Sequence, residues 1–302
     1  SFGDFLRLLP TQKLRNNIKE LFQVLDTPTE QRDPYLEDDL AKFPYVNGGL
    51  FSEENIEIPM FTDEIKDVLV NEMSQFNWSD ISPTIFGAIF ESTLNPETRR
   101  SGGMHYTSIE NIHKVIDPLF LDDLRAEFEK HKALKNVKER NRRLETFRQN
   151  LSTLVFFDPA CGSGNFLTEI FLSLRRLENE ALSVIQEGNV TLFGMTPIYV
   201  SISQFYGIEI NDFAVSVAKS AMWIAEHKMM LETERITLQD LNFLPLKTYT
   251  NIVEGNSLCV DWETVVPKDK LSYIIGNPPF VGYSLQNKEQ KEEILSIYID
   301  EK

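Results

Sequence analysis

The sequence predicts a parallel α/β sheet with helices on its faces in the C-terminal half of the chain, preceded by an all-helical domain. After residue 150, short apolar segments that fit strands alternate with longer helical patterns. Before residue 120, helical patterns are separated by loops rich in proline and glycine. The 302 residues are enough for two domains with cores of their own.

The predicted helical domain covers residues 1–120. A helix is expected between residues 12 and 25, where apolar side chains recur at helical spacing, at Leu14, Ile18, Leu21, Phe22 and Leu25. Residues 27–59 contain several prolines and glycines, so this stretch is predicted to be largely loop.

Further helices in this domain are predicted from their first residues. Thr62 is a predicted N-cap, because Asp63 and Glu64 follow it in the first turn. Another helix is expected at residues 83–94, and the domain is expected to end with a helix that starts at Ser108.

Residues 121–150 are predicted to form a charged helical connector. Between residues 125 and 148 there are nine basic and four acidic side chains. Such a run of charge is usually a solvated helix face. The alternative is a strip that faces phosphate groups, which would partly offset the acidic character of the whole chain.

Composition excludes several classes of protein. The chain is 42% hydrophobic and 25% charged, an ordinary balance for a globular protein, with a net charge of −16 and therefore no overall basic footprint for nucleic acid. No apolar run reaches the roughly 20 residues of a membrane span. Two cysteines give no disulfide framework and fit the cytoplasm; both are expected to be small packing residues.

The expected sheet domain covers residues 151–302. Its four strand candidates are residues 154–158, 204–210, 251–255 and 271–277. Helices are expected from the first glycine-rich loop to about Glu187 and from Asp212 to Met230. This alternation predicts parallel strands whose carboxyl ends meet at one edge of the sheet.

The glycine-rich segment DPACGSGNF, residues 158–166, lies where the first strand meets a helix. Gly162 and Gly164 allow a sharp turn and a close approach to a ligand. The dinucleotide fingerprint is broken because Leu167 occupies its third glycine position, and the loop has no lysine of a P-loop. A nucleotide-like ligand without a diphosphate is therefore favoured.

Polar residues also follow the second and fourth strands. Glu209 ends the second, where a carboxylate can accept hydrogen bonds from ribose hydroxyls. The segment NPPF, residues 277–280, follows the fourth, and its two prolines form a rigid turn that fixes one amide, one backbone carbonyl and one aromatic ring.

In this order, DPACGSGNF, GIEIN and NPPF resemble motifs I, II and IV of the gamma group of DNA adenine-N6 methyltransferases. HYTSIENI, residues 105–112, resembles motif X of that group. FPYVNGGLF, residues 43–51, and the segment at residues 78–91 resemble the helical region of MmeI-like combined restriction-modification enzymes of types IIG and IIL.

The resemblance implies a class I methyltransferase sheet, which is Rossmann-like and doubly wound. Only four strands are visible, so the sheet is expected to be incomplete, with its C-terminal part and a target-recognition region downstream or on a separate subunit. The implied cofactor is S-adenosyl-L-methionine, and the residues implied to bind it are Thr107, Asp158, Ala160, Gly162, Gly164, Asn165, Glu209 and Asn256. Asn256 stands where the family has an acid that binds the cofactor adenine.

The implied reaction is methyl transfer to N6 of an adenine flipped out of double-stranded DNA. The implied catalytic residues are Asn277, Pro278, Pro279 and Phe280. Asn277 Oδ1 and the Pro278 carbonyl would accept hydrogen bonds from the adenine amine, and Phe280 would stack on the base.

Other functions remain open at this point. They are a modification subunit of a type I restriction system, a methyltransferase for protein glutamine or ribosomal RNA, and a non-catalytic cofactor-binding or assembly module. Cytosine-C5 transfer is disfavoured because Cys161 and Cys259 do not follow proline. The four histidines form no zinc motif, so no metal is expected, and any nuclease is expected to lie upstream.

Overall fold

The computed structural model describes residues 2–46, 51, 57–76, 81–85, 87–88, 107–187, 197–241, 249, 251–280, 282, 284 and 286–297. The chain divides into two compact units, and the second unit begins at Ser82. Residues 82–150, expected to be the end of a helical domain and a connector, therefore belong to the same unit as the sheet.

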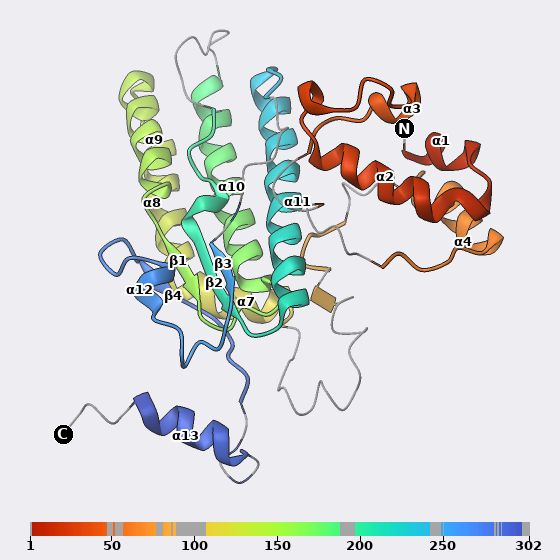
Figure 1. The fold of residues 1–302 in the computed structure, drawn as a ribbon. Helices are drawn as coiled ribbons and strands as arrows, with labels where there is room; N and C mark the ends of the chain where they lie inside the picture. Colours follow the sequence, from red (N-terminus) through yellow and green to blue (C-terminus); the bar gives the residue numbers. More distant parts are fainter. Residues whose placement is uncertain are drawn as a thin grey trace. The chain divides into compact units, whose positions relative to one another are not determined.

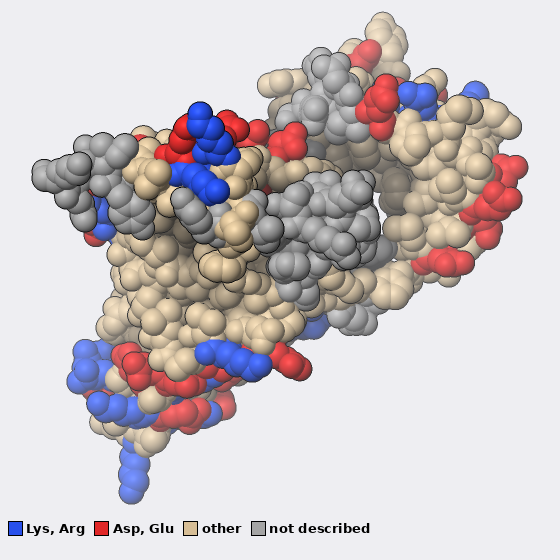
Figure 2. Space-filling model, turned by 90° about the horizontal axis from the view of Figure 1, so that it is seen from below, with Lys and Arg blue, Asp and Glu red and all other residues tan. Residues whose placement is uncertain are grey.

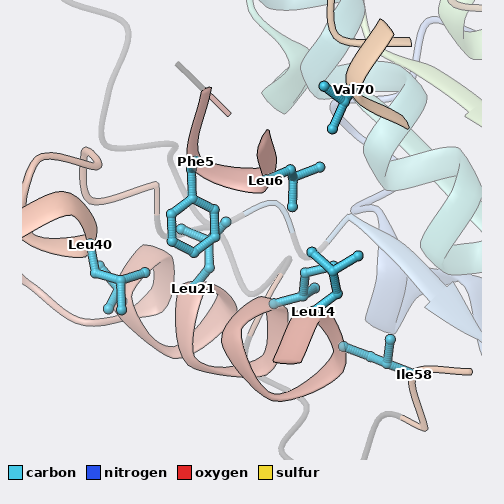
Figure 3. Close-up of a cluster of buried hydrophobic side chains, with 9 residues drawn as sticks. Phe5, Leu6, Leu14, Leu21, Leu40, Ile58 and Val70 are labelled. Carbon is cyan, nitrogen blue, oxygen red and sulfur yellow. The ribbon is translucent and has the colours of Figure 1, made fainter. Parts of the chain in front are cut away.

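The first unit is helical, as predicted. It contains α1 (Phe2–Leu8), α2 (Leu14–Asp26), α3 (Asp38–Ala41), α4 (Asp63–Asp67) and the π-helical turn η3 (Val68–Met73), with short 3-10 turns at Thr11–Lys13 and Thr29–Gln31. Side chains from these elements form one buried apolar cluster, shown in Figure 3, that includes Leu6, Leu14, Leu21 and Leu40. The predicted apolar stripe of residues 12–25 is therefore the core-facing side of α2.

Hydrogen bonds hold the loop that follows α2. The guanidinium of Arg32 donates to the carbonyls of Val24, Thr27 and Phe43 at 2.8–3.1 Å. These carbonyls lie in the last turn of α2 or after the helix, and the charged donor offsets the cost of leaving them partly buried. At the start of α4 the Thr62 hydroxyl accepts a hydrogen bond from the Ile65 amide, so the predicted N-cap is confirmed.

The second unit contains the four predicted strands, β1 (Phe156–Asp158), β2 (Phe205–Glu209), β3 (Ile252–Glu254) and β4 (Tyr273–Ile274). The described sheet has the order β3-β2-β1-β4, and every neighbouring pair is parallel (Figure 1). Helix α10 (Asn165–Gln186) joins β1 to β2, and α11 (Asp212–Thr237) joins β2 to β3. Helix α11 ends seven residues later than predicted, because Thr233 and Thr237 continue its buried face beyond Met230.

The two neighbouring phenylalanines of β1 point to opposite faces of the sheet. The Phe156 ring stacks on Phe205 and Tyr273, with centroids 5.3 and 5.4 Å away. Phe157 packs in a second cluster with Ile208 and Val266, and α12 (Trp262–Val265) supplies an edge-to-face ring to it. On the first face Phe171 of α10 packs edge-to-face on Phe205, so helices pack on both faces of the sheet, as a doubly wound fold requires.

Before β1 the chain forms α7 (Ile109–Ile116), the π-helical turn η5 (Asp117–Leu121), α8 (Asp122–Lys132) and α9 (Val137–Leu151). Helices α8 and α9 pack on each other, and α9 packs along α10 (Figure 1). The stretch expected to be a connector is thus a packed part of the second unit. Helix α13 (Lys288–Ile297) follows the sheet.

The charges of α8 and α9 are largely satisfied locally. Glu139 bonds Arg142 and Arg143, and Lys132 pairs with Glu129. These ion pairs fit a solvated helix face better than a strip of free cations for phosphate. On the face of the molecule shown in Figure 2, Lys and Arg side chains lie close to Asp and Glu side chains. No described helix is long and apolar enough to span a membrane.

A buried ionic cluster links α9, α10 and the segment after residue 196. Arg175 pairs with Glu178 and donates to Thr233 Oγ1 at 2.6 Å, while the other Glu178 oxygen lies 3.7 Å from Arg148 Nη2. Glu178 also accepts hydrogen bonds from the amides of Tyr199 and Val200. Arg148, predicted as part of a solvated run, is instead fully buried.

Candidate active site

The predicted site residues collect at the carboxyl edge of the sheet. Asp158 ends β1 and Glu209 ends β2, while Asn256 and Asn277 closely follow β3 and β4. Because β1 lies between β2 and β4, the chain order reverses beside β1. Ligands of open α/β sheets bind at such a switch point.

The glycine loop between β1 and α10 requires its two glycines. Gly162 and Gly164 have φ of +55° and +78°, which residues with a Cβ rarely adopt. Gly164 is the N-cap of α10, and a Cβ there would lie 3.0 Å from the Cβ of Ala218 on α11. A Cβ at Gly162 would meet nothing within 4 Å, so the loop borders open space at that residue.

The Glu209 carboxylate holds this loop in place. Its Oε2 accepts a hydrogen bond from the Gly162 amide at 2.9 Å, and its Oε1 accepts one from the Asn211 amide at 3.0 Å. The residue is 7% exposed. Since a carboxylate has about four acceptor positions, each oxygen can accept one more hydrogen bond.

Asp158 is a buried carboxyl at the centre of the switch point. Its Oδ1 accepts a hydrogen bond from the Ala160 amide at 3.0 Å, and the residue is 1% exposed. The chain after β4 passes so close that a Cβ on Gly276 would lie 2.2 Å from this oxygen. Burial, with a smaller effect of the neighbouring Glu209 charge, raises the pKa of Asp158 to about 7.

This raised pKa makes the stability of the second unit depend on pH. Between the ordinary value of 3.8 and about 7, the folded chain keeps a proton on Asp158 that the unfolded chain has lost. The contribution of Asp158 to the free energy of unfolding therefore falls as pH rises through this range, by about 1.4 kcal/mol per pH unit. In Asp158→Asn, which keeps the acceptor for Ala160, this loss should be absent.

Urea unfolding of both proteins without cofactor, at several values between about pH 5 and 7, measures the difference. The free energy of unfolding of Asp158→Asn should increase relative to that of the wild type as pH rises. A difference that stays constant across this range would show that Asp158 ionises like an exposed carboxyl.

Asn277 is joined to the predicted motif X residue. Its Nδ2 donates to Thr107 Oγ1 at 3.2 Å, across 170 residues of sequence. This bond orients the amide and leaves Oδ1 as an acceptor for another donor. Pro278 and Pro279 are exposed, and the Phe280 side chain is 92% exposed beside them.

Asn256 and Asn165 have partners that the sequence does not reveal. Asn256 Oδ1 accepts a hydrogen bond from the Leu258 amide at 3.0 Å, so this side chain caps the turn after β3. The Asn165 side chain lies against Gly87, where a Cβ would be 2.4 Å from its Oδ1. Gly87 thus determines how closely its segment approaches the glycine loop.

Other residues at the carboxyl edge of the sheet are not indicated by the sequence motifs. Gly276 is needed for the approach to Asp158, and Ile210 is an apolar side chain left 67% exposed directly after Glu209. Cys161 is buried as expected, whereas Cys259 is exposed, contrary to its expected packing role. In the described part of the chain no group of three or more His, Cys, Asp or Glu side chains could hold a metal ion.

Parts of three predicted motifs lie outside the described residues. These parts are residues 47–50 of FPYVNGGLF, residues 78–80, 86 and 89–91 of the following segment, and residues 105–106 of the motif X match. The twelve predicted cofactor-binding and catalytic residues all lie within the described part of the chain.

The comparisons with known proteins all point to DNA methyltransferases related to MmeI. Residues 134–302 match the family model of the MmeI DNA-methyltransferase domain, and residues 1–51 match that of the MmeI helicase spacer domain. "DNA methyltransferase A" of Bacillus subtilis (strain 168) is 39% identical over 306 residues, covering 99% of this chain and 33% of that protein.

The solved structure of the type IIL restriction-modification enzyme MmeI in complex with DNA is 38% identical to this chain, with a TM-score of 0.87. The match covers 99% of this chain and 39% of that one, so the chain spans well under half the length of these relatives. The strand order and this similarity identify a class I methyltransferase fold. The chain belongs to the MmeI DNA-methyltransferase family.

Proposed function

We propose that the protein containing this chain transfers the methyl group of S-adenosyl-L-methionine to N6 of adenine in DNA, as part of a restriction-modification enzyme. The observation that carries the proposal is the approach of the two loops at the switch point. Gly276, directly before Asn277, lies against Asp158 of the glycine loop, so a ligand of that loop would lie beside the NPPF turn.

The residues at this edge fit the proposed cofactor. Open space borders Gly162, and the Glu209 carboxylate retains acceptor positions for ribose hydroxyls. Ile210 and Leu258, 67% and 39% exposed, follow neighbouring strands and offer apolar surface to an adenine ring. S-adenosyl-L-methionine supplies a methyl group on a positively charged sulfonium, a charge that the acidic residues of this edge favour.

The NPPF turn fits the proposed acceptor. The adenine amine is a weak nucleophile because its lone pair is conjugated with the ring. Hydrogen bonds from its two N–H groups to Asn277 Oδ1 and the Pro278 carbonyl favour a tetrahedral nitrogen with its lone pair free for the methyl group. Because the prolines fix this turn before the base arrives, little reorganisation is needed during the reaction.

Phe280 has the exposure that a base-stacking residue needs. Its ring is 92% exposed in the described structure, and a flipped adenine would cover it. Stacking of this kind contributes roughly 1–3 kcal/mol per base. The −16 charge of the chain gives no long-range attraction to DNA, so we assign the main phosphate contacts to another part of the protein. We place the reaction in the cytoplasm.

The Glu209→Ala variant tests the cofactor site. Loss of a charged acceptor should weaken S-adenosyl-L-methionine binding by about 1–3 kcal/mol. Glu209→Gln keeps one oxygen acceptor and should lose less. Calorimetric titration of the folded variants measures both affinities, and unchanged affinity in Glu209→Ala would remove Glu209 from the site.

The proposed reaction is tested with the full-length protein, duplex DNA and a radiolabelled methyl donor. Nucleoside analysis after digestion should show N6-methyladenine. Methylcytosine, methylated protein glutamine or methylated RNA would each contradict the substrate, and preferential binding of a nicotinamide dinucleotide would contradict the cofactor. Cofactor binding without transfer to any acceptor would indicate a non-catalytic module.

A further inference from the structure

His113 lies between two carboxylates that belong to different parts of the second unit. Its Nδ1 is 2.7 Å from Asp117 Oδ1 in the turn after α7, and its Nε2 is 3.2 Å from Glu169 Oε1 on α10. Each carboxylate also contacts an arginine. Arg176 Nη1 donates to Glu169 at 3.2 Å, and Arg125 Nη1 lies 3.5 Å from Asp117.

The hydrogen bonds between the His113 ring and the two carboxylates depend on which groups carry a hydrogen. An ionised carboxylate only accepts hydrogen bonds, so a ring nitrogen that bonds one must carry a hydrogen. The His113 ring thus reaches one carboxylate from each of its two nitrogens, and a nitrogen that carries a hydrogen is the donor. The Glu169 side chain is 3% exposed, so the bond that crosses from α7 to α10 is shielded from competing water.

Helix α7 connects this contact to the NPPF turn. Ser108 caps its first turn by accepting from the Asn111 amide, and Thr107 directly precedes that cap. Thr107 Oγ1 in turn accepts the hydrogen bond from Asn277. On the other side, Glu169 lies in the second turn of α10, whose first residue, Asn165, belongs to the glycine loop.

We propose that His113 is a positioning residue for methyl transfer. By fixing α7 to α10 through Glu169, it holds Thr107 in the position where the Thr107 hydroxyl accepts the hydrogen bond from Asn277 and so orients the amide. The proposal rests on the proposed function of Asn277. Misplacement of a reacting group by about 1 Å can cost on the order of 100-fold in rate, so a contact remote from the base can still affect the reaction.

A double-mutant cycle in the full-length protein tests the route through Thr107. His113→Ala and Thr107→Val, which removes the hydroxyl at nearly constant volume, should each lower the single-turnover rate by about tenfold. The double variant should be little slower than either single variant, because both changes release the same amide. Because Thr107 is also an implied cofactor-binding residue, these rates are measured at saturating cofactor, and cofactor affinity should change no more in His113→Ala than in Thr107→Val.

His131→Ala is the matched control. His131 also bonds a carboxylate four residues away, Glu127 at 3.3 Å, but both lie on α8. This variant should keep the wild-type rate. His113→Gln, which keeps one N–H donor for Glu169, should fall between wild type and His113→Ala, and it replaces the alanine variant if that one does not fold.

Hydrogen exchange without cofactor or DNA gives a readout independent of activity. His113→Ala should speed exchange in peptides covering residues 107–116 and 275–280, and His131→Ala should not. Rate losses that multiply in the double variant, or unchanged exchange at residues 275–280, would overturn the proposal. If the wild type binds cofactor but methylates no DNA, the proposed function fails, while the exchange result still decides whether His113 holds Thr107 and Asn277.

Discussion

Asn277→Ala is expected to lower the rate of adenine methylation by about 10²–10³, by analogy with the loss of one preorganised polar group from a catalytic site. The amide is held by Thr107 through Nδ2, so its oxygen is already oriented when the base arrives. The benefit of this acceptor arises mainly in the transition state, where the amine nitrogen develops positive charge. Cofactor affinity should therefore barely change.

Single-turnover methylation of matched duplexes and of duplexes with a mismatch opposite the adenine measures this loss. Phe280→Ala is the comparison variant, because Phe280 is expected to hold the flipped base rather than to act on its amine. A mismatched adenine is already partly unpaired, so the mismatch should restore part of the Phe280→Ala rate and little of the Asn277→Ala rate. Equal rescue of both variants, or of neither, would contradict this division of roles.

Glu178→Ala is expected to destabilise the second unit by about 3–5 kcal/mol, the cost of removing one partner of a buried ion pair. Glu178 contacts Arg175 and Arg148, whose side chains are 2% and 0% exposed. Without it, Arg175 keeps Thr233 as a partner and Arg148 keeps Glu145, but the charge that lies between the two guanidinium groups is lost. The amides of Tyr199 and Val200 lose their acceptor as well.

Glu139→Ala is the matched control, because Glu139 also bonds two arginines, Arg142 and Arg143, but on the solvated surface of α9. These arginines lower the pKa of Glu139 to about 2, and solvent screening nevertheless makes such pairs weak. Denaturant unfolding of both variants should give a much larger loss for Glu178→Ala. Similar losses would show that the buried cluster contributes no more than a surface pair.

The sequence by itself determined the main elements of the second unit and the edge of the sheet at which the candidate residues lie. Strands and helices could be predicted because short apolar segments and the helical spacing of apolar residues are local properties of the chain. The N-cap at Thr62, the four strands and the helix after DPACGSGNF all follow from residues within a few positions of one another. Parallel strands then place Asp158, Glu209, Asn256 and Asn277 at one edge, which is why the candidate site could be predicted before its geometry.

Only the tertiary structure decided which distant groups meet. Nothing local indicates that Asn277 bonds Thr107, that Gly276 lies against Asp158, or that His113 reaches Glu169. The same holds for Arg148, whose neighbours in sequence suggest a solvated face although it is fully buried. Hydrogen bonds and burial depend on partners brought together by the packing of whole elements, and a local pattern specifies the face of an element but not the partner opposite it.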